Sequence, residues 1–272
     1  MNKIERYGVL EASCARDELD VVAEELRLLG YATLDAGLAP DEIDRLSEAF
    51  DGAAEHYAHQ ASSGGHDLDK LGEKDTIRAL PAAAPEFWSL VFNARLNDLL
   101  VRLLGDYFIL NQANGLINRG NASKYSQAAF HRDLPYQHFV ASRPIAINAL
   151  FALDEFTLEN GATRVIPASH HREAFPSEEV IRNLQKQVTV PRGTYIVLDC
   201  MLYHAGATNH SSNDRRAVNH VFTIPMMRQQ LHFPSLLGND HSFDERKRRI
   251  LGFGLEEYRS VSDWLGSRAA RG

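Results

Sequence analysis

The sequence predicts a mainly β fold class, a double-sheet β core with flanking helices, and three observations support this. Apolar residues recur at helical spacing in the first hundred residues. Over about 106–226 the chain carries short runs rich in Ile, Val, Phe and Tyr, separated by glycine, proline and asparagine, a pattern typical of an antiparallel sandwich or barrel. Helical spacing returns over about 240–270. Because no stretch resembles a linker, we expect a single domain over 1–272, with a helical N-terminal part to about 105.

The N-terminal part begins with a predicted helix at 15–29. Leu19, Val22 and Leu26 recur at helical spacing there, and Gly30 follows as a helix-ending residue. The other elements expected before the β core are a strand at 31–35, a helix beginning at Pro40, a mobile loop at 62–70, and a helix that covers much of 85–105 and ends at Gly105. We expect these helices to flank the β core.

Seven apolar runs predict the strands of the β core. In chain order they are YFILNQ, GLINRG, SQAAFHRD, PIAINALFALDEF, ATRVIPAS, GTYIVLDCMLYH and RRAVNHVFTIPMM. Each is short and is bounded by turn-forming residues, as in antiparallel sheets. Two further helices are expected at the C-terminal end, in ERKRRILGFG and LEEYRSVSDWLG.

Composition narrows the class of partner. A formal net charge of −7 and a pI near 5.9 disfavour nucleic acid and anionic membranes, which attract basic proteins, so a small-molecule substrate is expected. No window approaches the ~18 uninterrupted apolar residues of a membrane span. Cys14 and Cys200 are too few for a disulfide scaffold and no secretory signal is visible, so we expect a cytoplasmic protein. The composition predicts no oligomeric state.

The segment FHRDLPYQ, at 130–137, places a histidine and an aspartate two residues apart in an apolar-rich stretch. In a strand, residues two apart project from the same face, so His131 and Asp133 converge while Arg132 points away. A cation bound there would neutralise the carboxylate and use the imidazole lone pair, which removes the cost of burying both groups. Non-haem Fe(II) oxygenases use two histidines and one carboxylate on one face of the metal. The sequence therefore predicts a metal site that needs a second histidine.

His204 is the predicted second histidine. It ends an apolar strand and is followed by a polar turn and another strand, so strand pairing can bring it back to the first two ligands. His210, in a polar turn, and His220, on a strand, are the alternatives. A competing His-x-carboxylate pair, His171 and Glu173, lies in a charged stretch with no apolar strand around it.

Arginines and polar residues near these ligands are candidates for ligand binding. Arg215 can hold a carboxylate through a bidentate, charge-assisted pair. Arg216 is the alternative, because adjacent strand residues face opposite ways and the pattern does not say which faces inward. The candidates for the lining of a substrate pocket are Tyr136, Gln137 and Arg143, which follow the metal motif.

Taken together, these residues resemble the phytanoyl-CoA dioxygenase family of Fe(II)- and 2-oxoglutarate-dependent oxygenases. The resemblance covers roughly 31–225 and rests on His131-Arg132-Asp133, on ENGATRVIPASHH at 159–171, and on His204, Asn209 and Arg215. It implies a double-stranded β-helix, a cupin-like jelly roll, as the core. It implies His131, Asp133 and His204 as the iron ligands, Arg215 as the partner of the distal carboxylate of 2-oxoglutarate, and Asn118 as a further cosubstrate contact.

The resemblance also implies the reaction and its cofactors. These are Fe(II), 2-oxoglutarate and O2, which oxidise a C–H bond of the substrate with succinate and carbon dioxide as coproducts. Asp133 favours hydroxylation, or another C–H oxidation, over halogenation, because the halogenating relatives carry a small residue in place of the carboxylate. Ala168 departs from the family's Pro-Gly-Ser-His turn, and Gly206 stands where some relatives have a serine that contacts the cosubstrate. One hydrogen bond to 2-oxoglutarate must then come from elsewhere.

Two other function classes use the same scaffold. A jelly-roll metalloenzyme without redox chemistry, an isomerase or hydrolase, would use the histidines with zinc or manganese but needs no arginine for a dicarboxylate. A non-catalytic binding protein would be expected to have lost a ligand, whereas all three are present in this sequence. The family acts on acyl chains, amino acids, sugars and other metabolites, so the fold does not select the substrate.

Overall fold

The computed structural model describes residues 4–122, 125–238 and 242–269. The chain is a mixed α/β protein with two antiparallel sheets, one of six strands and one of three. Helices hold more residues than strands, so the expected mainly β class is corrected to a mixed one. The difference arises because α2 is 24 residues long, whereas each strand of the smaller sheet has only 2 residues.

The predicted helices are present, but the helix expected over 85–105 is divided, the last one begins only at residue 261, and four short helices, at 68–71, 80–83, 178–184 and 233–237, were not expected. In chain order the helices are α1 (Glu18–Leu29), α2 (Pro40–Ser63), α3 (Leu68–Leu71), α4 (Leu80–Ala83), α5 (Trp88–Val91), α6 (Ala94–Leu104), α7 (Glu178–Leu184), α8 (Phe233–Leu237), α9 (Glu245–Ile250) and α10 (Val261–Ala269). The helix expected over 85–105 is divided because Asn93 caps α6, accepting from the Leu96 N–H, and donates to the Ala36 carbonyl. None of the helices within the described ranges is long and apolar enough to cross a membrane.

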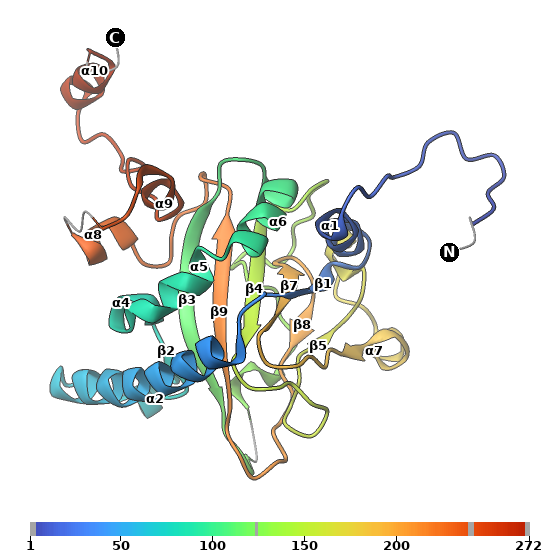
Figure 1. Cartoon of the computed structure of the whole chain (residues 1–272), viewed down its shortest axis with the longest axis horizontal. Helices are drawn as coiled ribbons and strands as arrows, with labels where there is room; N and C mark the ends of the chain where they lie inside the picture. Colours follow the sequence, from blue (N-terminus) through green and yellow to red (C-terminus); the bar gives the residue numbers. More distant parts are fainter. Residues whose placement is uncertain (1–3, 123–124, 239–241, 270–272) are drawn as a thin grey trace.

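The segment expected to be a loop at 62–70 is partly helical. α2 continues to Ser63, and α3 begins at Leu68 after a short turn. Asp67 caps α3 by accepting from the Lys70 N–H, and Gly72 ends it in the left-handed region at φ 70°. These two helices and their turn project beyond the edge of the large sheet (Figure 1).

Most strands follow the predicted runs, but several differ. The short strands at 76–77 and 186–187 were not expected, and the run GTYIVLDCMLYH gives two strands, at 194–199 and 204–205, in different sheets. The strands are β1 (Tyr31–Asp35), β2 (Thr76–Ile77), β3 (Ile109–Asn118), β4 (Ala146–Ala152), β5 (Arg164–Val165), β6 (Lys186–Gln187), β7 (Thr194–Asp199), β8 (His204–Ala205) and β9 (Arg215–Thr223). The first two predicted runs merge into β3, with an irregularity between Leu110 and Gln112. The run at 126–133 forms a short 3-10 turn and one isolated bridge rather than a strand.

The six-stranded sheet has the order β1-β7-β4-β9-β3-β2, and the smaller sheet has the order β6-β5-β8. Because β1 and β2 come from the N-terminal part, that part is built into the large sheet as well as covering it. In Figure 1, α2, α4, α5 and α6 lie over the face formed by β3, β9 and β4. The buried apolar residues of these strands and helices form the largest core cluster.

The other face of the large sheet carries polar residues around a cavity. Register pairs Asn114 with Asn219, Asn118 with Arg215, and Leu150 with Asn219, so these residues share one face. The smaller sheet lies on the same side, since the cavity is lined both by this face and by His204 of β8. The largest core cluster therefore sits on the helix side, and the candidate site lies on the other side, next to a smaller apolar cluster.

Candidate metal centre and its cavity

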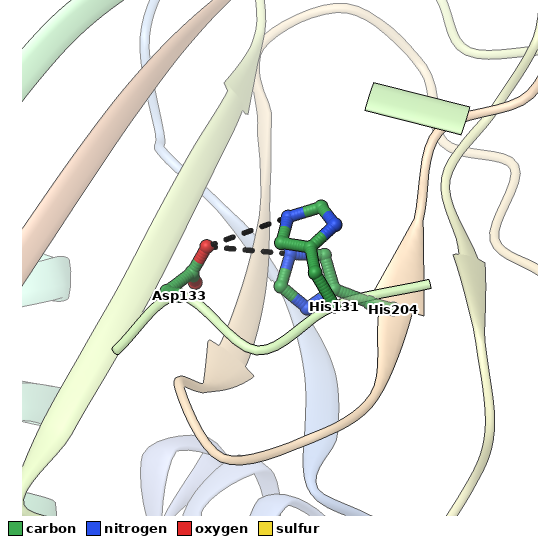
Figure 2. A group of neighbouring side chains, drawn as sticks. All are labelled: His131, Asp133 and His204. Carbon is green, nitrogen blue, oxygen red and sulfur yellow. Dashed lines mark ion pairs between the residues drawn. The ribbon is translucent and has the colours of Figure 1, made fainter. Parts of the chain in front are cut away.

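His131, Asp133 and His204 converge on one point at the cavity (Figure 2). The backbones of His131 and His204 form an antiparallel bridge, with N–H to carbonyl distances of 2.9 and 3.0 Å. Asp133 Oδ1 lies 3.4 Å from His204 Nε2 and 3.9 Å from His131 Nε2. The three ligand atoms all lie within 4.8 Å of one another. The site joins two segments far apart in the sequence through a single bridge.

The ring orientation of both histidines suits a divalent metal. His131 Nδ1 lies 2.9 Å from the Ala129 carbonyl, and His204 Nδ1 lies 3.0 Å from the Leu202 carbonyl. Each Nδ1 can therefore donate its proton to the main chain, which leaves the Nε2 lone pair free to coordinate. The Asn148 amide donates to Asp133 Oδ2 at 2.9 Å and orients that carboxylate. The donor set is two imidazoles and one carboxylate, as in the facial site of non-haem iron oxygenases.

The charges of the triad also fit a cation. Burial alone raises the pKa of Asp133, but the neighbouring His204, with a smaller contribution from the Asn148 amide, outweighs it and lowers that pKa to about 2. Burial and the adjacent His204 lower the pKa of His131. Burial also lowers the pKa of His204, but the attraction of Asp133 outweighs it and raises that pKa. Asp133 is thus an ionised carboxylate, and His131 keeps a free lone pair, as metal binding requires.

The alternative ligands are excluded by their positions. His171 is exposed, with Nε2 3.1 Å from the Arg27 carbonyl. His220 is fully buried on the helix-covered face, with Nδ1 3.1 Å from the Ala149 carbonyl. His210 is exposed. Within the described ranges, the group of His, Cys, Asp and Glu residues that can hold a metal consists of His131, Asp133 and His204.

Arg132 points away from the triad, as predicted, into a buried site. Its guanidinium lies 4.0 Å above the Tyr203 ring, and its side chain is nearly inaccessible. Its main acceptors are backbone carbonyls, those of Met201 at 2.6 Å, Ser169 at 3.1 Å, Gln137 and Arg172. Arg132 therefore ties the segment between the first two ligands to the turn that precedes His204.

The structure distinguishes the two candidate arginines. Arg215 lines the cavity, is 3% exposed, donates to the Gly161 carbonyl at 2.6 Å and leaves its buried Nε without a partner. Arg216 faces the opposite side of the sheet, where it pairs with Asp154 at 2.7 Å and Asp51 at 2.9 Å. Only Arg215 of this pair can reach a ligand in the cavity.

The Asn-Gly turn that precedes β5 positions Arg215 and Asn118. Gly161 has φ 79°, and a Cβ there would lie 2.2 Å from the Ala207 carbonyl oxygen, so only glycine fits. Asn118 is fully buried, and its amide donates to the same carbonyl at 2.9 Å. Among the described residues, Asn118 Oδ1 has no hydrogen-bond partner. The turn, β3 and the segment after His204 are therefore held together beside Arg215.

Tyr125 occupies the space that the missing side chain at Gly206 leaves open. A Cβ at Gly206 would lie 2.3 Å from Tyr125 Cε1. Tyr125 lines the cavity, and its hydroxyl interacts with the Arg215 guanidinium. Burial raises the pKa of Tyr125, so the phenol stays protonated and can donate a hydrogen bond. Sequence reasoning missed this residue, because no spacing relates it to the metal motif.

The three residues expected in the substrate pocket lie away from the metal. Tyr136 is 70% exposed. Gln137 closes its own turn by donating to the carbonyls of Arg132 and Leu134. Arg143 lines a separate cavity with Arg27 and His170. The structure does not bring these three side chains into the lining of the metal cavity.

The metal cavity itself has a volume of about 230 Å³. Besides the triad, Arg215 and Tyr125, polar side chains of the large sheet and of the residues next to β2 and β5 line it, namely Thr76, Arg78, Gln112, Asn114, Asn148, Thr163 and Asn219. Asn148 and Asn219 each have a buried Oδ1 without a hydrogen-bond partner in the part of the chain that the structure describes. Alternation of polar residues in RRAVNHVFT was visible in the sequence, but only the register brings them beside Asn114.

Comparisons with known proteins agree with this geometry. A family model described as Phytanoyl-CoA dioxygenase (PhyH) matches residues 26–217. An uncharacterized protein of Mycobacterium tuberculosis is 29% identical over 265 residues, covering 90% of this chain and 93% of its own length. Dioxygenase trt7 of Aspergillus terreus is 26% identical over 270 residues, covering 90% of this chain and 87% of its own.

Solved structures share the fold. EctD from S. alaskensis with bound Fe matches with a TM-score of 0.63 and 25% identity, covering 80% of this chain and 82% of that chain. EctD with 2-oxoglutarate and 5-hydroxyectoine matches with a TM-score of 0.64 and 24% identity, covering 82% of each chain. The arrangement of helices and antiparallel sheets is therefore an EctD-like fold.

Proposed function

The chain belongs to the phytanoyl-CoA dioxygenase family of Fe(II)- and 2-oxoglutarate-dependent oxygenases, and from this premise we propose that it oxidises a C–H bond of a small-molecule metabolite, with succinate and carbon dioxide as coproducts. One observation carries the proposal. The ligand atoms of His131, Asp133 and His204 lie within 4.8 Å of one another at the wall of a cavity. Hydroxylation is favoured over halogenation because the carboxylate ligand is present.

The triad holds the metal, and its neighbours set the orientation of the ligands. His131 and His204 would coordinate Fe(II) through Nε2, since their Nδ1 atoms face main-chain carbonyls. Asp133 supplies the third ligand and the compensating negative charge, held by Asn148. When bound, Fe(II) and 2-oxoglutarate supply the activation of O2, which protein side chains cannot perform.

Arg215 and Tyr125 are the proposed anchors of 2-oxoglutarate. The buried guanidinium carries an unpartnered Nε, so a carboxylate would satisfy a donor that otherwise costs free energy. Tyr125 would donate the hydrogen bond that Gly206 cannot supply. Asn118 is the cross-strand neighbour of Arg215, and we assign it a positioning role through Ala207. Its free Oδ1 is an acceptor and does not complement a carboxylate.

We further propose that the two sheets form a double-stranded β-helix within a single oxygenase domain. This is supported by β1 and β2, which add the N-terminal part to the large sheet. A cytoplasmic setting is proposed because Cys14 and Cys200 are free thiols, as expected in a reducing compartment.

Spectroscopy and turnover together test the proposal. Anaerobic addition of Fe(II) and 2-oxoglutarate should produce a weak charge-transfer band in the visible range, and a metabolite panel with O2 should identify a substrate that triggers succinate release. His131→Ala should abolish both, because it removes one of the three ligands. His210→Ala, at an exposed histidine outside the cavity, is the matched control and should keep both. Turnover that survives His131→Ala would overturn the site assignment.

A further inference from the structure

The metal cavity is small for a site that must hold a cosubstrate and a substrate. Its volume of about 230 Å³ lies below the ~300–1,000 Å³ of typical small-molecule pockets. If the proposed function is correct, Fe(II) and 2-oxoglutarate would occupy part of that volume. Only a small portion of the substrate can therefore lie beside the metal, and the rest must extend elsewhere.

A second, larger cavity of about 730 Å³ lies beyond the edge of the large sheet. It is an open groove bordered by the C-terminal end of α2, by α3 and by the segment at 230–231. Its apolar lining comes from Tyr57, Ala61, Leu68, Leu71 and Leu231. Leu71 is 61% exposed and Leu231 is 39% exposed, so the groove presents neighbouring apolar side chains that a ligand can cover. The SSGGHDLDK segment, which the metal site does not use, forms part of this wall.

Arg78 connects the two cavities. It lines both of them, at the end of β2. Its guanidinium donates to Glu73 at 2.6 and 2.8 Å, and to Gln230 Oε1 at 3.3 Å. Gln230 Oε1 also lies 3.4 Å from Asn114 Nδ2, and Asn114 lines the metal cavity. One layer of polar side chains on flexible stems therefore separates the apolar cavity from the metal cavity.

We propose that the two cavities form one substrate site divided at Arg78, and that the substrate is an elongated amphiphile. This proposal rests on the proposed function. It places the polar end of the substrate in the amide-lined metal cavity and the apolar body in the larger cavity. The C–H bond that is oxidised then lies near the polar end, since that end is beside the triad.

The charges on these side chains favour a neutral polar end. The positive charge of Arg78 is already matched by Glu73, and the groups that line the sheet side of the metal cavity are neutral amides. Asn219 Oδ1 is buried without a partner, so it can accept from a hydroxyl or amide N–H of the substrate. A hydroxyl or amide satisfies this acceptor, whereas a carboxylate end would repel it.

A series of linear alcohols tests whether the substrate site is divided into a polar and an apolar part. Calorimetric titration of 1-butanol, 1-hexanol, 1-octanol and 1-decanol into the anaerobic protein loaded with Fe(II) and 2-oxoglutarate should show affinity rising about fourfold per methylene group. Ala61→Trp fills the larger cavity and should stop this rise at a shorter chain. Ala58→Trp, on the same helix at an exposed position outside the lining, should leave the series unchanged.

A second variant tests the polar end. Asn219→Ala should lower the affinity of every alcohol by about fivefold, the worth of one hydrogen bond, while the dependence on chain length stays the same. Affinity that does not rise with chain length, or rises equally in Ala61→Trp, overturns the proposal. The charge-transfer band of Fe(II) and 2-oxoglutarate distinguishes the two proposals. If the band appears but alcohol affinity does not change with chain length, only the divided substrate site is refuted. If the band is missing, the proposed function is refuted.

Discussion

The two faces of the six-stranded sheet are made by alternate residues of the same strands, and they differ in kind. On the helix-covered face, Phe151, Val218 and Phe222 are buried in the main apolar cluster. On the cavity face, Asn114 and Asn219 stand opposite each other, with Leu150 beside Asn219. The difference teaches that the main apolar cluster lies on the helix side, whereas the cavity face combines a smaller apolar cluster with polar groups whose burial costs stability.

Arg215 and Arg216 show the same difference within one dipeptide. Arg216, on the helix side, is satisfied by the carboxylates of Asp154 and Asp51. Arg215, on the cavity side, keeps a buried donor without a partner. In this dipeptide the arginine on the helix side finds its partners within the chain, and the arginine on the cavity side keeps a donor available for a ligand.

The largest expected effect comes from the helix-covered face. Phe222→Ala should lower the free energy of unfolding by about 3–5 kcal/mol, because it leaves a cavity in the main cluster. Urea titration measures the loss, and the Fe(II) and 2-oxoglutarate band, recorded in the cold where the variant is folded, should be retained. Asn219→Ala is the control on the opposite face and should change stability by less than ~1 kcal/mol. Equal losses in the two variants would contradict the division of roles.

His220 is the exception on the structural face, an imidazole fully buried among apolar groups. Burial lowers its pKa from 6.5 to about 4. The unfolded chain binds this proton between those values and the folded chain does not, so stability should fall as pH drops from about 6.5 to 4. The contribution is on the order of 2–3 kcal/mol.

His220→Leu isolates that contribution. Urea titrations of both proteins from pH 4.5 to 7 should show a smaller loss of stability at low pH in the variant. The comparison removes the contributions of other titrating groups, including His170, whose pKa burial also lowers to about 4. Parallel pH profiles would show that His220 is not buried as a neutral ring.

The smallest expected effect separates the two arginines. Arg215→Leu should weaken 2-oxoglutarate binding about 10- to 100-fold, the range for a charge-assisted hydrogen bond. Arg216→Leu should leave that affinity unchanged and cost at most ~1 kcal/mol of stability, because its ion pairs are partly exposed. Titration of the visible band with 2-oxoglutarate measures both. A loss of affinity in Arg216→Leu alone would reverse the assignment.

Much of the fold could be predicted because its determinants are local. The start of α2 at Pro40 and the ends of α1 and α6 at Gly30 and Gly105 follow from residues with strong backbone preferences. The division at Asn93 could not be predicted, since it depends on a hydrogen bond to Ala36, far away in the sequence. The lengths of the strands in the smaller sheet were overestimated, because apolar runs also occur in buried turns.

The metal ligands were predictable for a related reason. His131 and Asp133 are two residues apart, and His204 lies next to a predicted apolar strand. The structure brings them together differently from the prediction, because 126–133 is not a strand, the apolar strand ends at Asp199, and His204 begins β8 and meets His131 through one isolated bridge. Tyr125 was not predictable, because its place follows from the space at Gly206. The expected lining residues Tyr136, Gln137 and Arg143 lie elsewhere, because the segment after the ligands turns away and is closed by Gln137.

By itself the sequence determined which donor atoms are available and which residues share a face, since both depend on residue type and on the period of two along a strand. Only the tertiary structure decided that Arg215 rather than Arg216 faces the cavity, that Asn114 meets Asn219, and that Arg78 stands between two cavities. The physical reason is that strand register and helix docking bring together segments far apart in the chain. No local sequence pattern predicts those contacts, because they are selected by the packing free energy of the whole core.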